Sequence, residues 1–254
     1  MPNIVFVLSI SRTELENSIR GYYGSERIDA SNYLRRFIDI QFDVPQPNSN
    51  KFCEMLVKYY GFNDFFMEGR GGLEGLDGFY EMATLMFTIA KIDLRTWDRI
   101  FAHSRLAAIQ VGSGDQIIME LIFLLCFLRI TQPEFYSKIR AKQFTVQELV
   151  NELENKLPRM LIEPNNETNY GRPQNYHAIL AIAELFYIYD YSINGRTGSI
   201  LSAKQGDESL NLDFTVINKE LFKNDIDWIK RYLRIDKDIS FFTDMVDMAS
   251  NFKD

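Results

Sequence analysis

The most apolar stretch of the chain is Ile117–Leu128, which reads Ile-Ile-Met-Glu-Leu-Ile-Phe-Leu-Leu-Cys-Phe-Leu. A helix that crosses a bilayer needs about 20 apolar residues. This stretch is shorter, contains Glu120 and is followed by Arg129. We therefore interpret it as a helix buried in the core of a folded domain rather than as a membrane span.

Helical patterns fill most of the sequence around this stretch. After Asn50, apolar residues recur at helical spacing almost throughout, and Thr145–Glu148 matches a capping box. Polar or glycine-rich interruptions lie at 61–76, 161–173 and 194–211, and the last of these is a candidate mobile loop or boundary. The predicted helices lie near residues 48–60, 77–91, 94–111, 115–130, 132–142, 145–157, 174–192, 220–234 and 239–252.

The composition is that of an ordinary globular protein. Of 254 residues, 46% are hydrophobic and 25% charged, which excludes collagen, a coiled coil and wholesale disorder. The charge balance, 28 − 35 = −7, argues against a general nucleic-acid binder, which is usually basic. The basic residues Arg129, Lys138, Arg140 and Lys142 form a modest cluster that is typical of a solvated helix face.

The numbers of cysteines and histidines argue against a disulfide-stabilised fold and against a metal site. Cys53 and Cys126 are too few for a disulfide framework, so a reducing, cytoplasmic location fits better. His103 and His177 show no paired spacing with cysteine, so we expect no metal site. The N-terminus carries no basic region or cleavage site of a targeting segment.

The first 47 residues differ from the rest. Residues 4–10 are apolar at nearly every position, as in a parallel strand buried on both faces. A capping-box match at Ser11–Glu14 starts a helix, and a short helix capped by Asp29 or Ser31 comes next. Residues 38–44 alternate between apolar and polar, which predicts a second strand.

These patterns predict a mainly helical protein with a small α/β remnant. We expect the remnant at 1–47, a helical subdomain at 48–130 and a C-terminal helical region at 131–254. A buried parallel strand needs neighbouring strands and helices on both faces. The sequence supplies at most one more strand, so either the fold is unusual or the chain is the back half of a larger α/β domain.

Three stretches resemble one family of ATPases. Ile4–Ile19, IVFVLSISRTELENSI, and Tyr33–Asp39, YLRRFID, resemble the region that follows the Walker B motif in KAP P-loop NTPases, which are distant relatives of AAA+ and STAND ATPases. Asp93–Phe101, DLRTWDRIF, resembles a later helix start of that family. The order and separation of the three stretches also fit, and the resemblance extends over residues 4–111.

The sequence lacks the motifs that hold nucleotide in such an enzyme. It contains neither G-x-x-x-x-G-K-[ST] nor an acidic Walker B pair, and its glycine clusters at 69–78 and 112–114 are not followed by Lys-Ser or Lys-Thr. In the family these motifs lie upstream of the first strand. The chain therefore resembles the C-terminal portion of a KAP NTPase, from the sensor-1 strand through a helical lid to a C-terminal helical bundle.

The resemblance points to three residues near the start of the chain. Ser11 falls at the sensor-1 position, where the family more often has Asp, but Ser is also a favoured helix N-cap. Arg35 or Arg36 could act as an arginine finger on a neighbouring subunit's phosphate. Cations near a helix C-terminus are also favoured by the helix dipole alone.

Arg95 resembles a sensor-2 arginine that reaches nucleotide from the lid. With Asp93 as N-cap, Arg95 lies in the first helical turn, where a cation is unfavourable by about 0.3–1 kcal/mol. A bound phosphate would offset that cost. The alternative is an exposed arginine paired weakly with Asp98.

Taken with the resemblance, the sequence leads to two hypotheses. The first is a sensor-and-lid fragment of a KAP-type ATPase, inactive by itself, with ATP and Mg²⁺ held by the full-length parent. Its partners would be the Walker-containing region and a further protein or a second copy, since a finger in trans implies an oligomer. The family is associated with membranes, signalling and bacterial antiphage defence. The second is a non-enzymatic helical interaction module whose first strand pairs with a partner.

Overall fold

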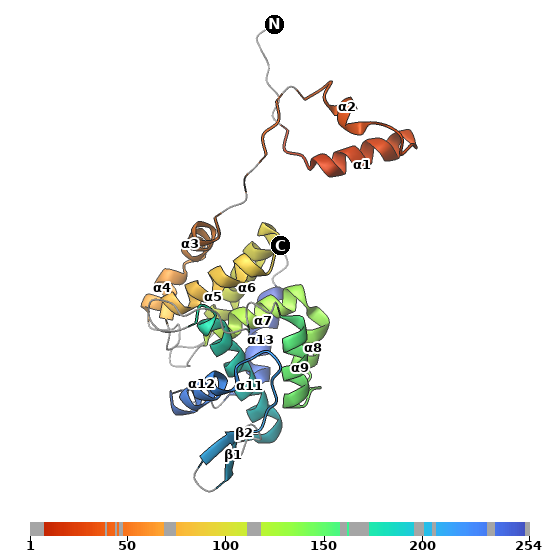
Figure 1. Ribbon diagram of the computed structural model, residues 1–254. Coiled ribbons are helices and arrows are strands. Elements are labelled where there is room, and N and C mark those ends of the chain that lie inside the picture. The colour runs from red at the N-terminus through yellow and green to blue at the C-terminus, as the bar shows by residue number, and fades with distance from the viewer. Residues whose placement is uncertain are drawn as a thin grey trace. The chain divides into compact units, whose positions relative to one another are not determined.

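The computed structural model describes residues 8–38, 40–43, 45, 48–68, 75–110, 118–157, 162, 173–195, 201–204, 207–232 and 237–251. The chain divides into two compact units, unit 1 (Met1–Gln46) and unit 2 (Pro47–Asp254). Figure 1 labels the elements of both.

Unit 1 consists, in its described part, of two helices, α1 (Arg12–Tyr23) and α2 (Ala30–Leu34). Gly24 ends α1 in a left-handed conformation at φ 63°, which glycine adopts without the Cβ clash that other residues meet. Asp29 caps α2 by accepting the N–H of Asn32 at 2.9 Å. Both caps are local features of the sequence.

The predicted strands do not appear in the described part of unit 1. Residues 8–10, 38 and 40–43 form no strand, while residues 4–7, 39 and 44 lie outside the described residues. A strand exists through ladder hydrogen bonds to a neighbour. The described residues between 8 and 45 offer no such neighbour, so the alternation at 38–44 forms no strand among them and no α/β remnant is shown.

Unit 2 is mainly helical. Its strands, in the described part, are β1 (Leu201–Lys204) and β2 (Asp207–Leu210), which pair antiparallel with Leu201 opposite Leu210. Its helices there are α3 (Ser49–Tyr59), α4 (Phe62–Met67), α5 (Gly75–Ile89), α6 (Leu94–Ile109), α7 (Met119–Thr131), α8 (Pro133–Arg140), α9 (Val146–Lys156), α11 (Tyr176–Asn194), α12 (Lys219–Tyr232) and α13 (Ile239–Asn251).

Helix α7 lies at the centre of unit 2, as its apolar sequence predicts. Every residue from Met119 to Leu128 is buried, and α7 packs against α5, α6, α8, α11 and α13 (Figure 1). The ring of Phe123 lies 5.2 Å, between centroids, from both Phe79 and Phe101. In the described part of the chain, no helix is both long and apolar enough to span a bilayer.

The sequence patterns missed α4 and the β1–β2 hairpin, which both fall in predicted interruptions. Gly61, left-handed at φ 67°, separates α3 from α4. Arg105 of α6 holds this corner, because its Nε donates to the carbonyl of Tyr60 at 3.0 Å and its guanidinium lies 5.1 Å from the Phe65 ring centroid. Helix α4 also packs against α5, where the ring of Phe62 stacks on that of Phe79 at 4.7 Å between centroids. These contacts, and not a helical pattern of its own, position α4.

Both cysteines are free and buried in unit 2. Burial raises the pKa of Cys53 to about 11 and that of Cys126 to about 12. The thiolate is the reactive form of cysteine, so both side chains behave as small apolar groups at neutral pH.

Glu154 of α9 anchors the segment that leads into α12. Its carboxylate, 7% exposed, accepts the backbone N–H groups of Thr215, Val216 and Ile217 at 2.8–3.0 Å and the Thr215 hydroxyl. Burial opposes ionisation of Glu154, but these hydrogen bonds outweigh it and lower the pKa of the carboxyl. The charged form of Glu154 therefore stabilises the fold.

Replacing this carboxylate by an amide tests the anchor. Glu154→Gln should lower the free energy of unfolding by about 1–3 kcal/mol at pH 7, because the amide NH₂ faces backbone donors. The folded pKa lies below the ordinary value of 4.5, so the difference from wild type should persist above pH 4.5 and shrink as the pH falls through the folded pKa.

Urea unfolding of both proteins between pH 3 and 8 measures this difference. Glu152→Gln is the control, because the one side-chain contact of Glu152 among the described residues is with Lys156, at 3.7 Å on the surface of the same helix. An equal loss of stability in the two variants would contradict the assigned role.

Candidate functional site

Three of the four residues suggested by the sequence lie exposed in unit 1. The hydroxyl of Ser11 accepts the N–H of Glu14 at 3.4 Å and so caps α1. Arg35 is the C-cap of α2, and Arg36 follows it in the turn. Among the described residues, neither arginine has a side-chain hydrogen bond or ion pair.

The fourth residue, Arg95, lies in unit 2 as the second residue of α6. Asp93 caps this helix as predicted, accepting the Thr96 N–H at 2.8 Å and its hydroxyl at 2.7 Å. The Thr96 hydroxyl and backbone bonds lower the pKa of Asp93. Arg95 is exposed and has no side-chain partner among the described residues.

Arg95 is exposed, as the alternative interpretation expects, but the pairing with Asp98 does not form. Asp98 accepts a hydrogen bond from the Tyr60 hydroxyl at 2.7 Å and makes no ion pair with Arg95. The carboxylate thus belongs to the contact between α6 and the end of α3. The cation in the first turn of α6 therefore has no compensating charge from Asp98.

Arg12 organises unit 1, although no motif pointed to it. Its Nε donates to Glu16 at 2.9 Å, its Nη1 to Gln41 at 2.7 Å, and its Nη2 to the Ser31 hydroxyl. One guanidinium therefore connects α1 with α2 and with the chain that follows. The pairing with Glu16 at i+4 was the only local signal of this role.

Unit 1 exposes large apolar side chains. Tyr22 and Phe42 are 85% and 86% exposed, whereas Ala30 and Leu34 are the buried residues of its described part. Further exposed apolar side chains are Leu8, Ile10, Tyr23, Phe37 and Ile40. Exposed apolar side chains concentrated on one small unit are typical of a surface that another polypeptide covers.

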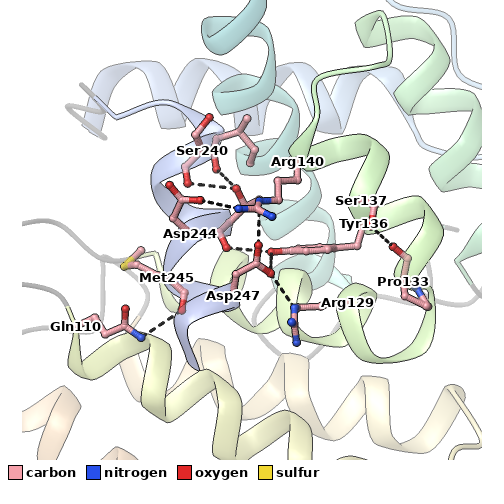
Figure 2. Close-up of polar contacts among 12 residues, drawn as sticks. Gln110, Arg129, Pro133, Tyr136, Ser137, Arg140, Ser240, Asp244, Met245 and Asp247 are labelled. Carbon is pink, nitrogen blue, oxygen red and sulfur yellow. Dashed lines mark hydrogen bonds and ion pairs between the residues drawn. The ribbon is translucent and has the colours of Figure 1, made fainter. Parts of the chain in front are cut away.

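Unit 2 carries an ionic cluster between α7, α8 and α13. Asp247 of α13 accepts from Arg129 Nε at 2.8 Å and pairs with Arg140 Nε at 2.9 Å (Figure 2). The Tyr136 hydroxyl donates to the Thr243 carbonyl at 3.0 Å and lies 3.2 Å from Asp247. Burial, and then the charge of Asp247, raise the pKa of Tyr136, so its hydroxyl stays protonated.

This cluster changes the interpretation of the basic residues around α8. Arg129 and Arg140 meet Asp247, and Lys142 pairs with Asp238 at 2.8 Å. Three of the four cations in the predicted solvated face therefore hold α13 against the rest of unit 2. The hydrogen bonds from Lys142 and the backbone outweigh burial and lower the pKa of Asp238.

A metal centre does not emerge from the described residues, in which no three His, Cys, Asp or Glu side chains lie close enough together to hold a metal ion. His177 Nε2 lies 3.3 Å from Glu81 Oε2.

Comparisons with protein-family models, curated proteins and solved structures found no match. The likeness to KAP NTPases therefore stays a prediction.

Removing the guanidinium of Arg12 tests the organisation of unit 1. Arg12→Gln should destabilise α1 and α2 by about 1–2 kcal/mol, because three charge-assisted hydrogen bonds are lost from a partly exposed group. Amide hydrogen exchange in residues 12–34 should accelerate roughly tenfold, while the helices of unit 2 keep their protection.

Arg20→Gln is the matched control, since the side chain of Arg20 contacts Glu16 and Asn17 of its own helix and no other side chain in the described part of unit 1. Unchanged exchange in Arg12→Gln would show that α1 and α2 hold together without this side chain.

Proposed function

We propose that the chain supplies the sensor and lid elements of an ATP-driven switch, and that a P-loop-bearing stretch of polypeptide covers unit 1. The exposed apolar side chains of unit 1 carry this proposal. A unit with Ala30 and Leu34 as its buried side chains, in the described part, has too little core of its own. A strand-and-helix core that bears a P-loop could pack against the exposed apolar side chains of unit 1 and bury them.

The unpaired arginines support a role toward phosphate. Arg35, Arg36 and Arg95 are exposed and have no ion pair among the described residues. A planar guanidinium donates two parallel hydrogen bonds to phosphate oxygens. Arg95 in addition lies where the N-terminal dipole of α6 favours an anion. In this proposal Ser11 and Arg95 contact nucleotide, and Arg35 or Arg36 acts in trans.

ATP and Mg²⁺ would be held by the P-loop-bearing part. The P-loop and magnesium supply most of the positioning and charge neutralisation in phosphoryl transfer. This chain alone should therefore neither bind ATP tightly nor hydrolyse it.

A second candidate function rests on the same apolar surface. Unit 1 could dock a protein partner without any nucleotide, as a helical interaction module. In this alternative the apolar run at 4–10, of which residues 4–7 lie outside the described part, pairs with a strand of the partner.

Calorimetric titration with Mg·ATP separates the two functions. We expect no binding by this chain alone and saturable binding once it is joined to a P-loop-bearing polypeptide encoded beside it. Arg95→Ala should then weaken binding about tenfold or more, because a charge-assisted hydrogen bond contributes about 1.5–3 kcal/mol.

Arg99→Ala is the matched control, an exposed arginine one turn further along α6. Nucleotide binding that is equal in Arg95→Ala and Arg99→Ala would remove Arg95 from the site. Association of the two polypeptides without any nucleotide binding would favour the interaction module.

A further inference from the structure

An open pocket of about 490 Å³ lies beside the ionic cluster of unit 2. Its volume is within the range of sites for small molecules. The lining comes from one face of α8, from the end of α7 and from α13, and consists of Arg129, Pro133, Tyr136, Ser137, Arg140 and Asp247.

Asp247 orients both arginines through the same atom of each side chain. It contacts Arg129 Nε at 2.8 Å and Arg140 Nε at 2.9 Å, one with each carboxylate oxygen (Figure 2). The Nη groups of Arg129 have no partner among the described residues. Arg140 Nη2 makes a longer contact with Asp244 at 3.3 Å, between side chains that are both half exposed.

Two lysines could hold α13 against α7 and α8 as well as the two arginines do. A lysine can meet one carboxylate oxygen as a point charge, whereas each arginine here adds a second pair of N–H groups that Asp247 does not use. Because the side chains are already ordered by Asp247, a ligand would meet donors that cost little entropy to immobilise.

The charge of the lining sets the class of ligand. Asp247 meets both arginines and Asp244 meets Arg140, so the Nη groups of Arg129 are the cationic donors of the lining that no carboxylate contacts among the described residues. The Ser137 hydroxyl donates its hydrogen to the Pro133 carbonyl at 2.8 Å, so the arginines supply the donors of this wall. Guanidinium donors of this kind match the acceptor oxygens of phosphate.

We propose that this pocket binds the phosphate group of a small solute, with Arg129 and Arg140 as its ligands and Asp247 as the residue that positions both. The pocket is larger than a phosphate ion, so it has room for the remainder of a phosphomonoester. The site lies wholly in unit 2 and does not depend on the nucleotide switch proposed above.

Calorimetric titration of the whole chain with inorganic phosphate, at constant ionic strength, tests the proposal. We expect saturable binding with one site per chain. Arg129→Lys should weaken it at least tenfold, because lysine keeps the ion pair with Asp247 but loses the second pair of donors. The thermal unfolding midpoint without phosphate should stay close to that of wild type, which separates ligand binding from the fixing of α13.

Two further variants show whether phosphate binds in this pocket or responds only to the charge of α8. Ser137→Glu adds a carboxylate to the pocket wall without removing any arginine contact, and it should abolish binding. Lys138→Gln removes a positive charge from α8 outside the lining and should leave the affinity within about twofold. Absence of saturable binding to wild type, or wild-type affinity in Arg129→Lys or in Ser137→Glu, would overturn the proposal.

A second titration, with glycerol 3-phosphate, identifies the source of the phosphate group. Tighter binding than that of inorganic phosphate would assign the site to phosphomonoesters. Equal affinity of the two would assign it to the free ion.

Discussion

Burial of α7 on every side is the constraint on which unit 2 depends. A helix with one apolar stripe can leave its other face in water, but the run from Met119 to Leu128 has no such face. Helices α5, α6, α8, α11 and α13 pack against it. One of these helices is α13, the last helix that the structure describes, so α7 cannot be fully buried until α13 has packed against it. The ion pairs at Asp247 and the apolar side chains of α13 therefore complete one core together.

Local signals predicted the helices of unit 2 well, and long-range contacts explain what they missed. The caps at Asp93 and Thr145 act within three residues, so spacing alone identifies them. Helix α4 and the strands of the β1–β2 hairpin are short and lie in glycine-containing segments. Their apolar residues do not repeat often enough to reveal a helical or strand pattern. The error at residues 38–44 has a related cause, since alternation predicts a half-buried face but not the neighbouring strand that would create one.

The same limit applies to the candidate sites. The exposed position of Arg95 in the first turn of α6 followed from its own helix. The roles of Arg12 and Asp247 did not follow from the sequence, because they arise from contacts that span 29 and 118 residues.

Unit 1 also buries too few side chains to balance the entropy that its folding costs. Ordering one residue costs about 1–2 kcal/mol of backbone entropy. Burial of Leu34 contributes about 1.5–3 kcal/mol and burial of the Ala30 methyl about 0.8 kcal/mol, which cannot offset that cost over the unit.

The burial of both thiols has a practical consequence for spectroscopy. Cys53 and Cys126 are the only cysteines in the sequence, and each is 0% exposed with a pKa far above neutral. A cysteine introduced on the surface would therefore be the one thiol that reacts readily with a maleimide or a spin label. Pairs of such labels, one in each unit, would turn the native chain into a distance reporter without first removing any residue of its core.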